Sequence, residues 1–140
     1  MAFNFRKALI SGIAGGIVLA LIQILWLPVS GGVLSLLYPN MPPWSFQLNE
    51  VMVRLIAFNF AEGLIFAFVF AIIFSGIPGK GLMKGVNYAL MLFFVNTVVG
   101  VGFAYLASPF PLLFLASQML IGLVQLLAMG AAVAIIYEKV

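Results

Sequence analysis

Four long apolar runs, separated by segments with glycine, proline or charged residues, dominate the pattern of the chain. Each run is about twenty residues or longer, which is the length that a helix needs to cross a bilayer. Only helices and closed barrels satisfy their backbone groups in lipid, and barrel strands alternate in polarity over about ten residues. These runs are continuous instead. We therefore predict an all-α integral membrane protein with four transmembrane helices, over about residues 8–27, 52–74, 83–106 and 112–137.

Glycine and proline also predict tight connections between the later helices. The segment Gly76–Gly81 contains Pro78, and glycine and proline together stop a helix and permit a sharp reversal of the chain. Pro109 and Pro111 have the same effect before the fourth helix. We therefore expect a single domain over residues 1–140, folded as an antiparallel bundle, and the sequence shows no convincing internal repeat.

The connection between the first two helices is longer. The first helix is expected to stop near Pro28, because proline removes a backbone donor and clashes with the preceding turn. Residues 28–49 would then form an external loop, and its portion 33–38 would lie as a short helix in the membrane interface.

The basic residues give an orientation. With four crossings, five of the six lie on one side of the membrane, and Arg54 alone lies on the other. Basic residues concentrate on the cytoplasmic side, so both termini are expected there. We predict a multi-pass protein of the cytoplasmic (inner) membrane of a prokaryote. A cleaved signal peptide is the alternative for the first run, but that run is longer than the usual 7–15 residues and no small-x-small site follows it. The five are Arg6, Lys7, Lys80, Lys84 and Lys139.

Composition removes several classes of function. Hydrophobic residues make up 66% of the chain and charged residues 6%, against about 25% charged in soluble domains. The chain has no cysteine and no histidine, so disulfides, thiol chemistry and imidazole ligation of a metal are excluded. We predict no cofactor, no metal and no nucleic-acid partner, because the few basic residues are scattered near the membrane edges.

Polar residues inside the runs mark the candidate site. Glu62 lies halfway along the second run, where a charged group is costly and is expected to face the bundle interior. By depth along antiparallel helices, Asn96 and Gln125 fall at the same level. Residues three, four or seven apart share a helix face, so further polar residues extend this layer into a column toward the outer side. These are Asn59, Gln118 and Gln23.

Three interpretations of this column remain open, and one of them is an exposed interface to another subunit. Amides and a carboxyl can simply hold helices together, at about 0.6 kcal/mol for each contact on average. Alternatively, the column is a site or path for protons, cations or a small substrate, because ionisable residues inside membranes are usually functional.

Small residues predict close helix packing. Gly12, Gly16 and Ala20 recur every fourth residue on the first run, and Gly100 follows Asn96 at the same spacing on the third. Such stripes let a neighbouring helix approach closely. Packing within one chain is the expected use, and a dimer seam along the first run is the alternative.

Three functions follow, in order of preference. The first is a non-catalytic structural or accessory subunit of a membrane complex, because the loops leave no soluble domain. The second is a small proton- or ion-coupled transporter or channel that uses Glu62. An intramembrane enzyme on a lipophilic substrate comes last, because a single buried carboxyl lacks an acid–base partner. The expected partners are the lipid bilayer and either other membrane subunits or further copies of the chain.

Overall fold

The computed structural model describes residues 4–37, 48–107 and 111–140, and nearly all of these are helical. Helix α3 continues without a break through the π-helical segment η1 into α4, so these three elements form one rod, the third span. No strand occurs in the described ranges. The elements are α1 (Phe5–Leu37), α2 (Leu48–Ile73), α3 (Leu82–Leu92), η1 (Phe93–Val98), α4 (Val99–Ala107) and α5 (Leu112–Lys139).

All four of the rods described are long and apolar enough to cross a membrane, which confirms the predicted all-α class of multi-pass membrane protein. Large apolar side chains are exposed along every rod, as is expected of surfaces in contact with lipid. The third span is the least enclosed: 6% of its most apolar stretch is buried, against 28–39% in the other three. The spans are Phe5–Val29, Met52–Ile73, Leu82–Ala107 and Leu112–Lys139.

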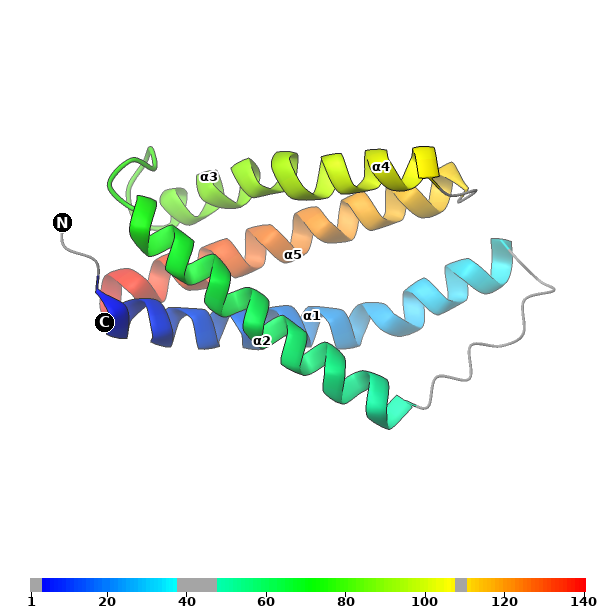
Figure 1. Cartoon of the computed structure of the whole chain (residues 1–140), viewed down its shortest axis with the longest axis horizontal. Coiled ribbons are helices and arrows are strands. Elements are labelled where there is room, and N and C mark those ends of the chain that lie inside the picture. Colours follow the sequence, from blue (N-terminus) through cyan, green and yellow to red (C-terminus); the bar gives the residue numbers. More distant parts are fainter. Residues whose placement is uncertain (1–3, 38–47, 108–110) are drawn as a thin grey trace.

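The first helix differs from the prediction at its end. It does not stop near Pro28 but continues to Leu37, so the expected external loop from residue 28 is wrong over its first part. A proline inside a helix costs one backbone hydrogen bond and bends the helix, and membrane helices tolerate this. Figure 1 shows the last turns of α1 (cyan) bending away from its first part. Residues 33–37 of the expected interfacial helix are thus the end of α1, and residues 38–47 of the loop lie outside the described residues.

The predicted turn between the second and third spans is present. Gly79 and Gly81 have positive φ angles of 100° and 55°, which glycine adopts without strain. This turn lies at the same end of the molecule as both termini (Figure 1). We call this the terminal end, and the opposite end the far end.

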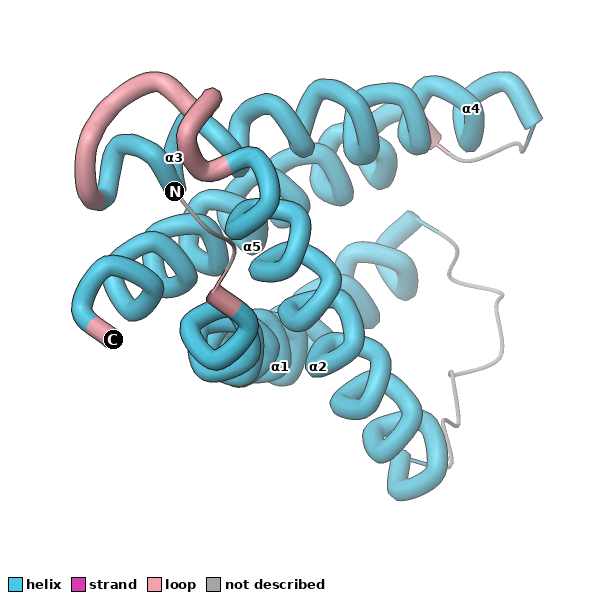
Figure 2. The backbone as a smooth tube through the Cα atoms, turned by 60° about the vertical axis from the view of Figure 1, so that its left-hand side comes forward, coloured by secondary structure: helices cyan, strands magenta, loops and turns pink. Residues whose placement is uncertain are grey.

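The packing of the rods differs between these two ends. Helix α1 packs against α2 and α5, and α3 packs against α5. Figures 1 and 2 show the rods gathered at the terminal end, whereas the first turns of α2 and the last turns of α1 lie apart from α4 and α5 at the far end. The helices therefore diverge toward the far end.

Glycines make the two closest helix crossings. A Cβ atom on Gly63 of α2 would lie 2.7 Å from both the Gly12 oxygen and the Gly16 Cα of α1. A side chain on Gly85 of α3 would likewise collide with the backbone of Gly130 in α5. Both crossings depend on the absence of a side chain, which lets the backbones approach.

The terminal end is filled by aromatic rings. Phe70 packs edge-on against Tyr137 at 5.7 Å between ring centroids, and Phe66 against Tyr88 at 4.5 Å. The Tyr88 hydroxyl donates a hydrogen bond to the Phe66 carbonyl oxygen over 3.3 Å. We call these residues, with Phe74, the aromatic cluster; the Phe74 ring lies 5.2 Å from that of Tyr137.

Two lysines close the aromatic cluster in a crosswise arrangement. Lys7, at the start of α1, donates to the Tyr137 carbonyl oxygen near the end of α5 over 3.4 Å. Lys84, at the start of α3, donates to the Phe74 carbonyl oxygen just after α2 over 2.6 Å. Each ammonium group also lies over the ring of the same residue, at 5.9 Å and 3.8 Å. The helix pairs α1–α2 and α3–α5 thus use one scheme, in which a lysine of each pair satisfies a carbonyl at the helix end of the other.

Candidate functional site

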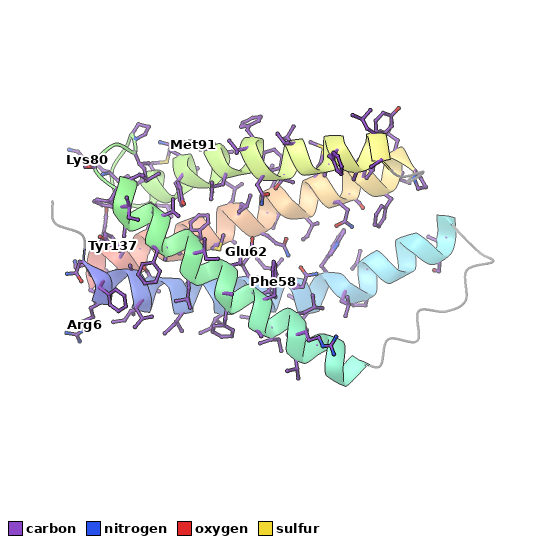
Figure 3. The ribbon with its side chains drawn as sticks, in the orientation of Figure 1. Arg6, Phe58, Glu62, Lys80, Met91 and Tyr137 are labelled. Atoms are coloured by element: carbon purple, nitrogen blue, oxygen red, sulfur yellow. The ribbon has the colours of Figure 1, made fainter. Side chains whose placement is uncertain are left out.

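Glu62 is the acidic residue that lies in the middle of a span. It lies near the middle of the long axis of the molecule, whereas Arg6, Lys80 and Tyr137 mark the terminal end (Figure 3). Its side chain is partly buried, and the described residues give it no hydrogen bond and no ion pair. Glu62 is one turn from Phe66 in the direction of the far end, so it lies just outside the aromatic cluster.

Asn59 lies one turn further along the same face of α2. It is 6% exposed, and its Nδ2 atom has no hydrogen-bond partner in the described part of the chain. Its backbone oxygen lies against Gly16 of α1, which fixes this turn of α2 beside α1. A buried amide donor without a partner is costly, so it needs an acceptor from elsewhere.

Two of the three glutamines of the predicted column meet. Gln125 of α5 donates from Nε2 to Oε1 of Gln23 in α1 over 2.6 Å. This bond ties α1 to α5 at the level where the helices begin to diverge. Gln118 lies two turns further toward the far end of α5 and is partly buried.

Asn96 does not join this layer. It is exposed and has no hydrogen bond among the described residues. In an unbroken α-helix Asn96 would lie two turns after Ala89, on the side that packs against α5. The π-helical segment η1 adds one residue to a turn, so Thr97 takes that place. A Cβ atom on Gly122 would lie 2.8 Å from Thr97 Cγ2, which shows how closely Thr97 packs on α5.

The small residues of the first span are used within the chain. Gly12 and Gly16 face α2, and Ala20 is buried on the same stripe. A dimer seam along this stripe would need the surface that Gly63 occupies. Gly100 differs from the expectation of close packing, because a Cβ atom there would meet nothing within 4 Å.

The sequence reasoning missed one polar group of the site. Trp26 of α1 has a buried Nε1 atom without a hydrogen-bond partner in the described residues. It follows Gln23 by three residues, and this spacing places both on one side of α1. The spacing of three residues from Gln23 could have indicated this polar group. A tryptophan near a membrane edge, however, is usually interpreted as an interface anchor.

The site offers hydrogen bonding and one negative charge. The described residues contain no group of three or more side chains that could hold a metal ion. A carboxyl one helical turn from an unpaired amide donor can take up and release a proton or hold a small cation. Comparison of the chain with protein-family models, with curated proteins and with solved structures found no match in any of the three. Function is therefore inferred from the site.

Proposed function

We propose that the protein is a small proton- or cation-coupled transporter in which Glu62 is the residue that takes up and releases the transported charge. The chain would form an antiparallel bundle in the cytoplasmic membrane of a prokaryote, with both termini in the cytoplasm. The basic residues at the terminal end support this orientation. The far end would then face outward.

One observation carries this proposal: within the described ranges, Glu62 has no hydrogen bond or ion pair to a neighbouring helix. If its role were to join helices, a hydrogen bond to a neighbouring helix is expected, as in the pair Gln125–Gln23. A charged residue at this depth costs about 2.5–3.5 kcal/mol on insertion scales. A glutamine at this position could serve for helix packing without the cost of inserting a charge. A glutamate that contacts no partner among the described residues therefore favours a functional role.

The two ends of the molecule support a site that opens outward. On the terminal side of Glu62, the aromatic cluster and the two lysines fill the space between the helix pairs. On the other side lie the polar side chains of Asn59, Gln125 and Gln23, and the helices diverge (Figure 1). Transport would require the terminal end to open in a second conformation. The third span is weakly buried, which supports the assembly of two or more copies of the chain through this span.

Proton flux into liposomes that contain the purified protein tests the proposal. A pH-sensitive dye inside the liposomes reports flux driven by an imposed membrane potential. We expect Glu62→Gln to abolish the flux, because an amide cannot carry the proton. The matched control is Glu138→Gln, which removes a carboxyl that accepts from the Gly81 amide at the terminal end, and it should keep the flux. Equal flux through the wild type and Glu62→Gln would refute the role of Glu62.

An accessory subunit is the second candidate, and the weak burial of the third span favours it, because a partner helix would cover that surface. Defined membrane proteins would then co-purify with the chain in mild detergent. The purified chain alone would show no flux. These two results together would replace the transporter proposal.

A further inference from the structure

Asn96 is an exposed polar side chain in the middle of the third span. It lies fourteen residues after Leu82 and eleven before Ala107, so at least about 16 Å of helix separates it from either end. Its side chain forms no hydrogen bond with the described residues. In the described ranges, the other polar side chains at mid-span are partly or fully buried, so Asn96 alone is exposed at this depth. The others are Asn59, Glu62, Thr97 and Gln125.

An amide at this depth finds no hydrogen-bond partner in the lipid. Acyl chains offer neither a donor nor an acceptor, and the short side chain of asparagine cannot reach the headgroups as a lysine or an arginine can. The amide has two donor hydrogens and one acceptor oxygen to satisfy. The apolar side chains around Asn96 are at home in lipid, but its amide requires a polar group of a neighbouring protein.

The π-helical turn is the reason that Asn96 lies on this surface. In an unbroken α-helix Asn96 would lie on the side that packs against α5, but the extra residue in η1 gives that place to Thr97. Such turns occur frequently at functional sites. The third span therefore packs on α5 through Thr97 and presents the amide of Asn96 on its open surface.

The surface around Asn96 allows another helix to come close. Gly100 lies one turn further on the same side, and a Cβ atom there would meet nothing within 4 Å. A glycine beside the amide lets a second backbone approach to hydrogen-bonding distance. Figure 1 shows the third span at the edge of the molecule, and it is also the least buried of the four. The amide and the room for a partner thus lie together.

The chemistry of the amide favours a second copy of the chain as this partner. Copies of one sequence insert into the membrane with one orientation, so Asn96 of each copy lies at the same depth. A twofold axis along the membrane normal then brings the two Asn96 side chains together. An amide is complementary to itself, because each can donate to the oxygen of the other. Any other protein would have to supply a polar group at this same depth.

We infer that two copies of the chain pair through their third spans, with the helices crossing at Gly100 and the two Asn96 side chains hydrogen-bonded to each other. This inference names the surface for the assembly of copies described under the proposed function. It rests on the proposed function in that respect alone, because the pairing does not require Glu62 to carry protons.

Single cysteines test the seam, because the chain has no cysteine of its own. Phe103→Cys places a thiol on the side of Gly100, whereas Tyr105→Cys places one on the opposite side of the same helix. The two positions are matched in exposure, at 71% and 60%. Each purified variant in liposomes is oxidised with copper phenanthroline, and the dimer fraction is measured on gels. We expect Phe103→Cys to form dimers that persist on dilution in lipid, and Tyr105→Cys to form few.

Asn96→Val in the Phe103→Cys chain tests the amide itself. We expect it to weaken dimerisation about tenfold, measured as the lipid dilution that halves the dimer fraction. Thr97→Val removes a polar group one residue away, on the side that packs on α5, and should dimerise as the parent does. Gly100→Leu should also prevent pairing, whereas Gly102→Leu, on a different side of the helix, should not.

Several results would overturn the inference. Equal cross-linking of the two cysteine variants, or an unchanged dimer in Asn96→Val, would refute the seam. Absence of dimers, together with co-purification of a different membrane protein, would assign the surface to another subunit. Dimers that depend on Asn96, without proton flux in liposomes, would leave the seam standing and refute the transporter. Flux that depends on Glu62, without dimers, would refute the seam alone.

Discussion

Single glycines determine how closely the rods of this protein approach. Gly12 and Gly16 were expected from the sequence to pack against a neighbour, because their spacing places them on one face. Their partner Gly63 could not be identified in the same way, because a single glycine in an apolar run carries no spacing signal. The structure shows it to be the residue that meets both.

Gly63→Ala is predicted to destabilise the protein by about 2 kcal/mol, within the range for an overpacked core. The new Cβ atom would collide with the backbone of α1, which cannot move as a flexible side chain can. The free energy of unfolding, measured by titration with a denaturing detergent, checks this. Gly31→Ala is the control, because nothing lies within 4 Å of that position, and it should be neutral or slightly stabilising. A neutral Gly63→Ala would show that the crossing is looser than described.

At the scale of the element, the sequence predicted where the spans lie but not where they depart from regular α-helix. The apolar runs gave the four spans because length and continuity suffice for that purpose. The π-helical turn leaves no mark in an apolar run, so the expected place of Asn96 beside Glu62 and Gln125 assumed an unbroken α-helix. The prediction from Pro28 was wrong for a different reason: this proline bends α1 but does not end it.

Deletion of Val95 within η1 is predicted to be tolerated. Removing the extra residue turns the π-helical turn into regular α-helix and leaves both flanking faces in place, so Thr97 still packs on Gly122. Deletion of Val124, an exposed valine in the regular helix α5, is the control. This deletion rotates all later residues of α5 by about 100° and so removes their packed face. Size-exclusion profiles and thermal midpoints should be near wild type for the first deletion and lost for the second. The reverse result would contradict the role given to η1.

At the scale of the whole molecule, the shared scheme of the two helix pairs was not visible in the sequence. The two carbonyl acceptors belong to different residue types, Phe74 and Tyr137, and η1 shifts the register of the third span. The depth of the polar residues could be predicted from helix length. Which of them meet could not, because that depends on how far the rods diverge toward the far end (Figure 2).

Lys84→Met is predicted to destabilise the protein by about 2 kcal/mol, because it removes a charge-assisted hydrogen bond and a cation–π contact. Lys7→Met should cost less, because its hydrogen bond and ring distance are longer. Lys80→Met, in the exposed turn, is the control and should leave stability unchanged. Thermal midpoints in one detergent compare the three. Equal midpoints for Lys84→Met and Lys80→Met would refute the stabilising role of the crosswise lysines.

The crosswise lysines also govern how the terminal end can come apart. Each lysine belongs to one helix pair and donates to a carbonyl of the other, and the ring contact between Phe74 and Tyr137 lies between the same two pairs. Any movement that separates α2 from α5 at this end would therefore cost the ring contact as well as the lysine bonds, so the proposed opening carries its main energetic cost here.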